Sequence, residues 1–231
     1  MKVSELFQKL SFGEFSNLSI GNDGAGDIVV GKKPKILHYT NEALLRLYSR
    51  FILREADCLI EQQEWIRFYK LSPEFALSNP TPGDTTLYII DTEDKPFVED
   101  VIKILGVYGS DGCELPLNDR QNPYSVFTPQ ADVVQVPNPV QGSPLGVLYQ
   151  ARHVELKAYT DDIVLPATLN RALTSYIAYL TYSHMNGQEN AAKANEHMQI
   201  YEAICNEAEQ MGLVGDSHAT TNTRFANGGW I

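Results

Sequence analysis

Apolar side chains recur at helical spacing in the first quarter of the chain, which predicts two helices there. Ser4 is expected to cap the first helix, and Thr40 or Asn41 the second, because their side-chain oxygens accept hydrogen bonds from the free amides of a first turn. The apolar positions of these helices are Leu6, Phe7, Leu10, Leu44, Leu47, Tyr48 and Phe51. A glycine-rich loop at residues 21–27 separates them.

The last third of the chain has the clearest helical period. It predicts an antiparallel hairpin of two helices, residues 165–185 and 189–211. Pro166 suits a first helical turn, and Gly187 suits the position just past a helix end. The apolar stripes of the hairpin are Leu169, Leu173, Tyr176, Ile177, Leu180, Ala194, Met198, Tyr201, Cys205 and Ala208.

Between the helices, short segments rich in β-branched and aromatic residues predict strands. The expected strands are residues 57–61, 65–71, 85–90, 101–108, 132–136 and 145–159. Asp111 and Gly112 are expected to supply the positive-φ positions of a type I′ turn, after which residues 113–115 complete a hairpin. Residues 96–105 also fit a helix, but their β-branched content and the following turn favour a strand.

This order of elements predicts an α+β fold, with an antiparallel β module inserted into a helical frame. The helical domain is assigned to residues 1–54 and 161–215, and the β-rich module to residues 55–160. Residues 216–231 are assigned to an extended C-terminal arm.

Charge and composition narrow the classes of function. The net charge of −11 and the lack of a basic cluster beyond Lys32-Lys33-Pro34-Lys35 argue against specific nucleic-acid binding. No apolar run approaches the roughly 20 residues that span a bilayer. Three widely spaced cysteines give no disulfide framework, which is typical of a reducing cytoplasm.

No residue pattern predicts catalysis, a cofactor or a metal ion, so we expect no enzyme. Residues 26–33 have the glycine and lysine spacing of a phosphate-binding loop, but Lys33 stands where a Ser or Thr would hold magnesium. The five histidines are scattered singly, without carboxylates at metal-ligand spacing. In the arm, Phe225 and Trp230 either fold back onto the protein or act as aromatic anchors in a partner's groove.

Two regions resemble the head-to-tail adaptor proteins of short-tailed phages, also called head-completion or tail-tubular-A-like proteins. One is the run Ile36-Leu37-His38-Tyr39-Thr40-Asn41-Glu42-Ala43-Leu44-Leu45-Arg46-Leu47-Tyr48. The other is the late order of a strand at 147–156, Leu165-Pro166, two helices, and an arm with Arg224-Phe225 and Gly229-Trp230.

The resemblance implies a structural virion protein of the neck, assembled in the host cytoplasm. It implies a ring of about twelve copies below the portal protein, which continues the DNA channel without binding DNA specifically. The helices would form the ring wall, the β module would face a tail or nozzle protein, and no membrane is involved. Portal contacts are expected at Arg224, Phe225, Trp230 and Ile231. Packing between subunits is expected at Leu169, Leu173, Tyr176, Ile177, Met198 and Tyr201.

Two alternatives remain open from the sequence. One is another ring-forming virion component, such as a tail terminator. The other is a soluble cytoplasmic enzyme or regulator whose site assembles from residues scattered along the sequence.

Overall fold

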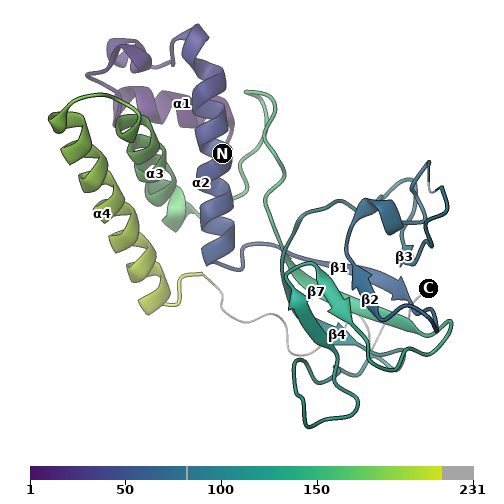
Figure 1. Ribbon diagram of the computed structural model, residues 1–231. Helices are drawn as coiled ribbons and strands as arrows, with labels where there is room; N and C mark the ends of the chain where they lie inside the picture. Colours follow the sequence, from purple (N-terminus) through teal and green to yellow (C-terminus); the bar gives the residue numbers. More distant parts are fainter. Residues whose placement is uncertain (82, 215–231) are drawn as a thin grey trace. The chain divides into compact units, whose positions relative to one another are not determined.

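The computed structural model describes residues 1–81 and 83–214, which form two compact units (Figure 1). Among the described residues, the helical unit comprises residues 1–53 and 153–214. The β unit comprises Arg54–Arg152 and is inserted between two helices of the helical unit. The fold is therefore α+β, as the sequence predicts. The predicted arm, residues 216–231, lies wholly outside the described residues.

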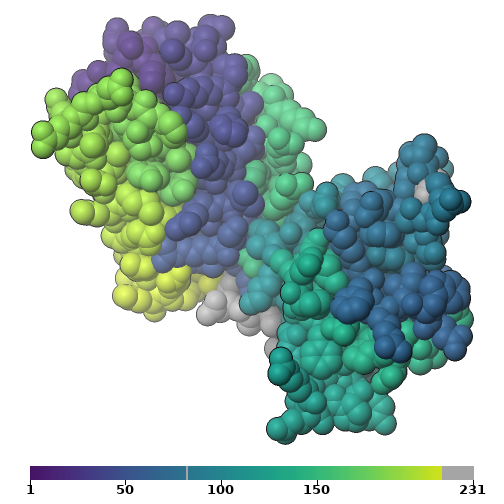
Figure 2. All heavy atoms as spheres, in the orientation of Figure 1, coloured from purple at the N-terminus to yellow at the C-terminus, as the bar shows by residue number. Residues whose placement is uncertain are grey.

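Four α-helices build the helical unit: α1 (Val3–Phe12), α2 (Lys33–Arg50), α3 (Asn170–Ser183) and α4 (Gln188–Gln210). Short 3-10 segments at Ser19–Gly24 and Val30–Lys32 connect α1 to α2, and another at Ala167–Leu169 leads into α3. The predicted hairpin is confirmed, since α3 packs along α4 and α2 lies against α3 (Figure 1). Figure 2 shows α4, coloured green to yellow, at the surface of this unit.

The predicted start of α2 is wrong, because the helix begins about seven residues earlier, at Lys33. Pro34 lies in its first turn, where a proline needs no amide partner. Thr40 is buried inside the helix, and its hydroxyl donates to the carbonyl oxygen of Ile36 at 2.8 Å. Asn41 instead binds a distant segment: its Oδ1 accepts from the Leu156 amide at 2.9 Å, and its Nδ2 donates to the Leu156 carbonyl at 3.0 Å.

The turn between α3 and α4 also differs from the prediction. The first helix ends at Ser183, and His184 occupies its C-cap. Gly187 belongs to the second helix, as its N-cap, with φ 112° and ψ 145°. A glycine is favoured there because side chains disfavour that backbone conformation, so the residue marks the entry to α4 and not the end of α3.

Two antiparallel sheets form the β unit. The larger has the order β3-β1-β7-β4, and the smaller has the order β2-β6-β5. The strands are β1 (Glu55–Glu61), β2 (Phe68–Lys70), β3 (Ile89–Ile90), β4 (Val101–Tyr108), β5 (Phe127–Gln130), β6 (Val133–Gln135) and β7 (Pro144–Ala151). The central pair is β1 and β7, with Cys58 opposite Val147. A 3-10 segment at Pro73–Phe75 lies between β2 and β3.

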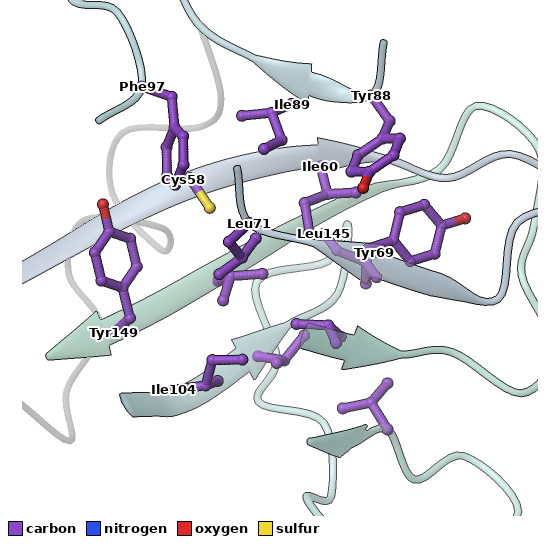
Figure 3. Packing of buried hydrophobic residues seen from close by; sticks show 14 of the residues in the cluster. Cys58, Ile60, Tyr69, Leu71, Tyr88, Ile89, Phe97, Ile104, Leu145 and Tyr149 are labelled. Atoms are coloured by element: carbon purple, nitrogen blue, oxygen red, sulfur yellow. The ribbon is translucent and has the colours of Figure 1, made fainter. Parts of the chain in front are cut away.

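Side chains from both sheets and their loops make a single core in the β unit (Figure 3). Phe97, Cys58 and Tyr149 gather at one end, and Tyr69 and Tyr88 at the other, with aliphatic side chains between them. Tyr69 and Tyr88 meet edge to face, with ring centroids 5.1 Å apart. This core uses no residue of the helices, so the inserted unit has its own packed interior.

Several predicted strands are too long, and β5 is not predicted at all. Of the strand predicted for 65–71, only Phe68–Lys70 pairs with another strand, as β2, and residues 65–67 lie in a loop. Of the strand predicted for 85–90, only Ile89–Ile90 pairs, as β3, and residues 85–88 lie in a loop. The hairpin after β4 is present, since the Gly109 amide donates to the Cys113 carbonyl at 2.9 Å. Its turn is not type I′, because Gly112 has φ 76° while Asp111 keeps a negative φ.

The strand predicted for residues 145–159 ends at Ala151, and the chain then enters the helical unit. Tyr159 packs its ring on Phe7 of α1, with centroids 5.7 Å apart. Asp161 closes a turn here, as its Oδ2 accepts from the amides of Lys157 at 2.7 Å and Ala158 at 2.8 Å. Residues 153–160 are therefore part of the helical unit, although the sequence places them in the β module.

Candidate functional site

The residues predicted to pack one subunit against another are largely used inside the chain. Leu169, Leu173, Ile177 and Tyr201 are fully buried, with no exposed surface. Tyr176 and Met198 are half-buried, and the Tyr176 ring lies on that of Tyr201 with centroids 4.9 Å apart. This part of the prediction needs correction, because a side chain without exposed surface offers no contact to another copy.

The predicted portal-binding residues Arg224, Phe225, Trp230 and Ile231 lie outside the described residues. The helical unit also has several large apolar side chains that are exposed and lie outside its core. They are Phe12, Val29, Val30, Leu45, Val154, Tyr159, Val164, Met211 and Leu213.

Arg50 forms hydrogen bonds that link α2, the helix before the β unit, to α4. The Arg50 guanidinium on α2 donates to Glu202 Oε2 at 2.6 Å, Glu209 Oε1 at 2.7 Å and Asn206 Oδ1 at 2.6 Å, all on α4. Hydrogen bonding to Glu209 raises the pKa of Arg50, against the opposing effect of burial, and Arg50 in turn holds the pKa of Glu209 below its usual range. The contact fixes α2 on α4 independently of the apolar core.

The histidines of the hairpin have separate aromatic partners. His184 stacks on Tyr39 of α2, with centroids 5.5 Å apart. His197 stacks on Tyr182 at 5.4 Å, and its Nδ1 lies 3.6 Å from Glu14 Oε2. These contacts fix the two rings as packing elements of the helical unit.

The thiols have the environment of structural cysteines. Burial raises the pKa of Cys58, and the neighbouring carboxylates of Asp57 and Asp100 add to the effect. Burial also raises the pKa of Cys205. Cys113 is exposed, and its hydrogen bond to Asp111 raises its pKa as well. A raised pKa lowers the thiolate fraction, so these residues lack the activation that a nucleophilic cysteine needs.

A polar clasp closes the β unit where the chain enters and leaves it. The Arg54 guanidinium lies 3.0 Å from Asp100 Oδ2 and donates to the Arg152 carbonyl at 2.9 Å. The Tyr149 hydroxyl donates to Asp100 Oδ1 at 3.1 Å, and the Arg152 amide donates to the Asp100 carbonyl at 2.8 Å. Asp100 is only 5% exposed. The first and last residues of the insertion are thereby held together.

The β unit also contains a pocket of about 580 Å³, a volume within the range of small-ligand and peptide-anchor sites. Its apolar lining comes from Leu115, Val126, Val136 and Leu145. Polar residues of three loops surround this floor, together with two strongly exposed side chains, Tyr124 at 78% and Val140 at 63%. Other polar lining residues are Gln62, Ser110, Asp111, Asn138 and Ser143.

Hydrogen bonds inside the β unit hold the pocket walls in place. The buried Gln62 accepts from the Val140 amide through Oε1 at 3.0 Å and from the Gly142 amide through its carbonyl at 2.8 Å. A second lining residue, the buried Ser125, donates its hydroxyl to the Pro116 carbonyl at 2.9 Å. The pocket is thus built from four separate stretches of sequence, which explains why the sequence pattern alone did not reveal it.

Comparison of the chain with models of known protein families gives no match, and comparison with curated protein sequences gives none. Within residues 1–81 and 83–214, no group of three or more His, Cys, Asp or Glu side chains could hold a metal ion. No helix in the described part of the chain is long and apolar enough to cross a membrane.

Proposed function

We propose that this chain is a structural head-to-tail adaptor of a tailed phage. It would form a ring below the portal protein, continue the DNA channel and provide the attachment platform for a tail or nozzle protein. The proposal rests on the resemblance of residues 36–48 and of the late order of elements to short-tailed phage adaptors.

One structural observation supports this function above others: a β unit with its own core interrupts a helical unit with its own core. An adaptor needs two surfaces that meet different partners, and an insertion closed at its base provides the second surface without altering the first. The helical unit is the candidate ring wall, and the β unit is the candidate platform for the tail.

The charge distribution is compatible with this division. Arg54–Arg152 contains fifteen acidic and seven basic residues, a net charge of −8 out of −11 for the whole chain. Repulsion would keep DNA from adhering to such a surface, while a basic protein partner would be attracted to it. The β unit is therefore suited to contact protein rather than nucleic acid.

The corrected packing residues change where copies would meet. Contacts between copies would use the exposed side chains of the helical unit, because four of the predicted packing residues are fully buried in its core. These are Leu169, Leu173, Ile177 and Tyr201. Val164 and Val30 are among the most exposed apolar side chains of this unit, at 74% and 79%.

The decisive experiment combines the purified chain with the portal protein of the same phage. Negative-stain imaging should show rings of about twelve copies on one face of the portal, since such rings arise from repeated head-to-tail contacts. Deletion of residues 217–231 should abolish decoration, whereas scrambling the order of residues 217–223 alone should preserve it, because Arg224, Phe225 and Trp230 remain in place.

A monodisperse monomer that ignores the portal would refute the adaptor function and favour a soluble enzyme or regulator. Rings that bind the free end of a tail tube but not the portal would instead indicate a tail terminator.

A further inference from the structure

We propose that the pocket of the β unit binds residues 217–231 of this chain, with Trp230 seated on its apolar floor. The segment comes from the same or a neighbouring copy. This docking concerns the free protein and does not rest on the adaptor function.

The lining of the pocket suits an aromatic anchor. The floor is formed by aliphatic side chains, of which Val126, Val136 and Leu145 are nearly or fully buried, while Tyr124 and Val140 stand exposed at the rim. A tryptophan gains most from such a site because its large ring is desolvated while its N–H reaches a polar rim. Asn138 and Ser143 provide polar groups among the lining residues.

Charge favours this segment as the occupant. Residues 217–231 include Arg224 and no acid, whereas the β unit has a net charge of −8. Asp111 lines the pocket, so an acidic side chain lies where the segment would arrive. Opposite charges raise the encounter rate and fix the orientation of a docked peptide.

The segment is also long compared with the unit that contains the pocket. Seventeen residues follow Val214, the last described residue, and an extended chain of this length spans roughly 55–60 Å. A unit of about 100 residues has a radius of gyration of only about 13 Å. The extended segment is therefore about four times as long as the radius of a unit of this size.

Tryptophan fluorescence of the full-length chain tests the proposal. The chain has two tryptophans, and Trp65 is 69% exposed, so Trp65→Phe removes it without disturbing the core. Trp230 is then the single reporter. We expect its emission to lie at shorter wavelength, and its quenching by acrylamide to be several-fold weaker, than in a synthetic peptide of residues 217–231.

Two rim variants in the Trp65→Phe background place Trp230 in this pocket. Val140→Lys adds a positive charge to the rim, which repels Arg224, and Tyr124→Ala removes an aromatic wall; both positions are exposed, so the fold is retained. Each should shift the emission and quenching of Trp230 toward the values of the free peptide. Val164→Lys is the matched control, because Val164 is 74% exposed in the helical unit.

Three results would overturn the proposal: a Trp230 as accessible as in the free peptide, protection that survives both rim variants, or an equal effect of Val164→Lys. Portal decoration is read separately. A chain whose Trp230 is protected by the pocket but that ignores the portal would refute the adaptor function alone, and the converse would refute the docking alone.

Discussion

The clasp of the β unit predicts a large and specific loss of stability when Arg54 is replaced by alanine. The substitution leaves the Asp100 carboxylate buried at 5% exposure, with only the Tyr149 hydroxyl as a side-chain partner. Removing one member of a buried ion pair costs about 3–5 kcal/mol. Because the Arg54 side chain is 37% exposed, water screens the remaining charge, and we expect about 2–3 kcal/mol.

That loss is measurable by calorimetry. In a unit of about 100 residues, each kcal/mol lowers the melting temperature by roughly 4–8 °C, so Arg54→Ala should lower the transition of the β unit by roughly 8–24 °C. Urea unfolding followed by near-ultraviolet circular dichroism gives the free energy independently. The core aromatics Tyr69, Tyr88 and Tyr149 make that signal sensitive to this unit.

Arg152→Ala is the matched control. Arg152 enters the clasp only through its backbone, as its carbonyl accepts from Arg54 and its amide donates to the Asp100 carbonyl. Loss of its exposed side chain should change stability by less than about 0.5 kcal/mol.

A double variant isolates the buried charge as the cause. Asp100→Asn keeps an oxygen for the Tyr149 hydroxyl but carries no charge, so Arg54→Ala combined with Asp100→Asn should cost less than the sum of the two single changes. Strict additivity, or equal losses for Arg54→Ala and Arg152→Ala, would refute this account of the clasp.

Three further predictions concern single residues. Burial raises the pKa of Asp91, but hydrogen bonds from Ser78 and from the Phe97 amide outweigh it and lower that pKa. The ionised Asp91 carboxylate therefore stabilises the fold above the unfolded pKa of about 3.9. This stabilisation is lost as the pH falls through the lower folded pKa. Asp91→Asn should cost about 1 kcal/mol at pH 7 and progressively less as the pH falls below about 3.9, as measured by urea midpoints; a cost that is independent of pH would contradict it. Gly187→Ala should cost about 1–3 kcal/mol because of φ 112°, with Gly31→Ala, which meets no atom within 4 Å, as a near-neutral control. Asn41→Ala should cost about 1–3 kcal/mol by orphaning the Leu156 amide and carbonyl, and faster hydrogen exchange at the Leu156 amide would report the loss.

The helices were largely predictable because their apolar faces are built from neighbouring turns. The sequence pattern places the start of α2 too late, because Thr40 and Asn41 are residue types that commonly cap helices. The Thr40 hydroxyl donates to a carbonyl oxygen of the preceding turn. The Asn41 side chain forms hydrogen bonds with Leu156, more than a hundred residues away in the sequence. A polar residue that bonds a distant segment looks the same in sequence as one that caps a helix.

Strand ends and the pocket were poorly predicted for a related reason. Residues 85–88 have strand-like composition, but pairing is available only where a partner strand lies, which confines β3 to Ile89–Ile90. The pocket needs Gln62, Ser125 and Val140 in fixed positions, which hydrogen bonds between residues 9 and 78 positions apart in the sequence provide. Local pattern contains no information on such contacts.

The separation of the two units has a functional consequence for the proposed adaptor. The clasp joins Arg54 to Asp100 and Arg152 within the β unit, so the insertion is closed by its own residues and not by the helices. Substitutions at Tyr124 or Val140 then alter the β unit while leaving the core around Leu173 and Tyr201 intact. A chain organised in this way can change one partner surface without losing the other, as a component held between two different partners requires.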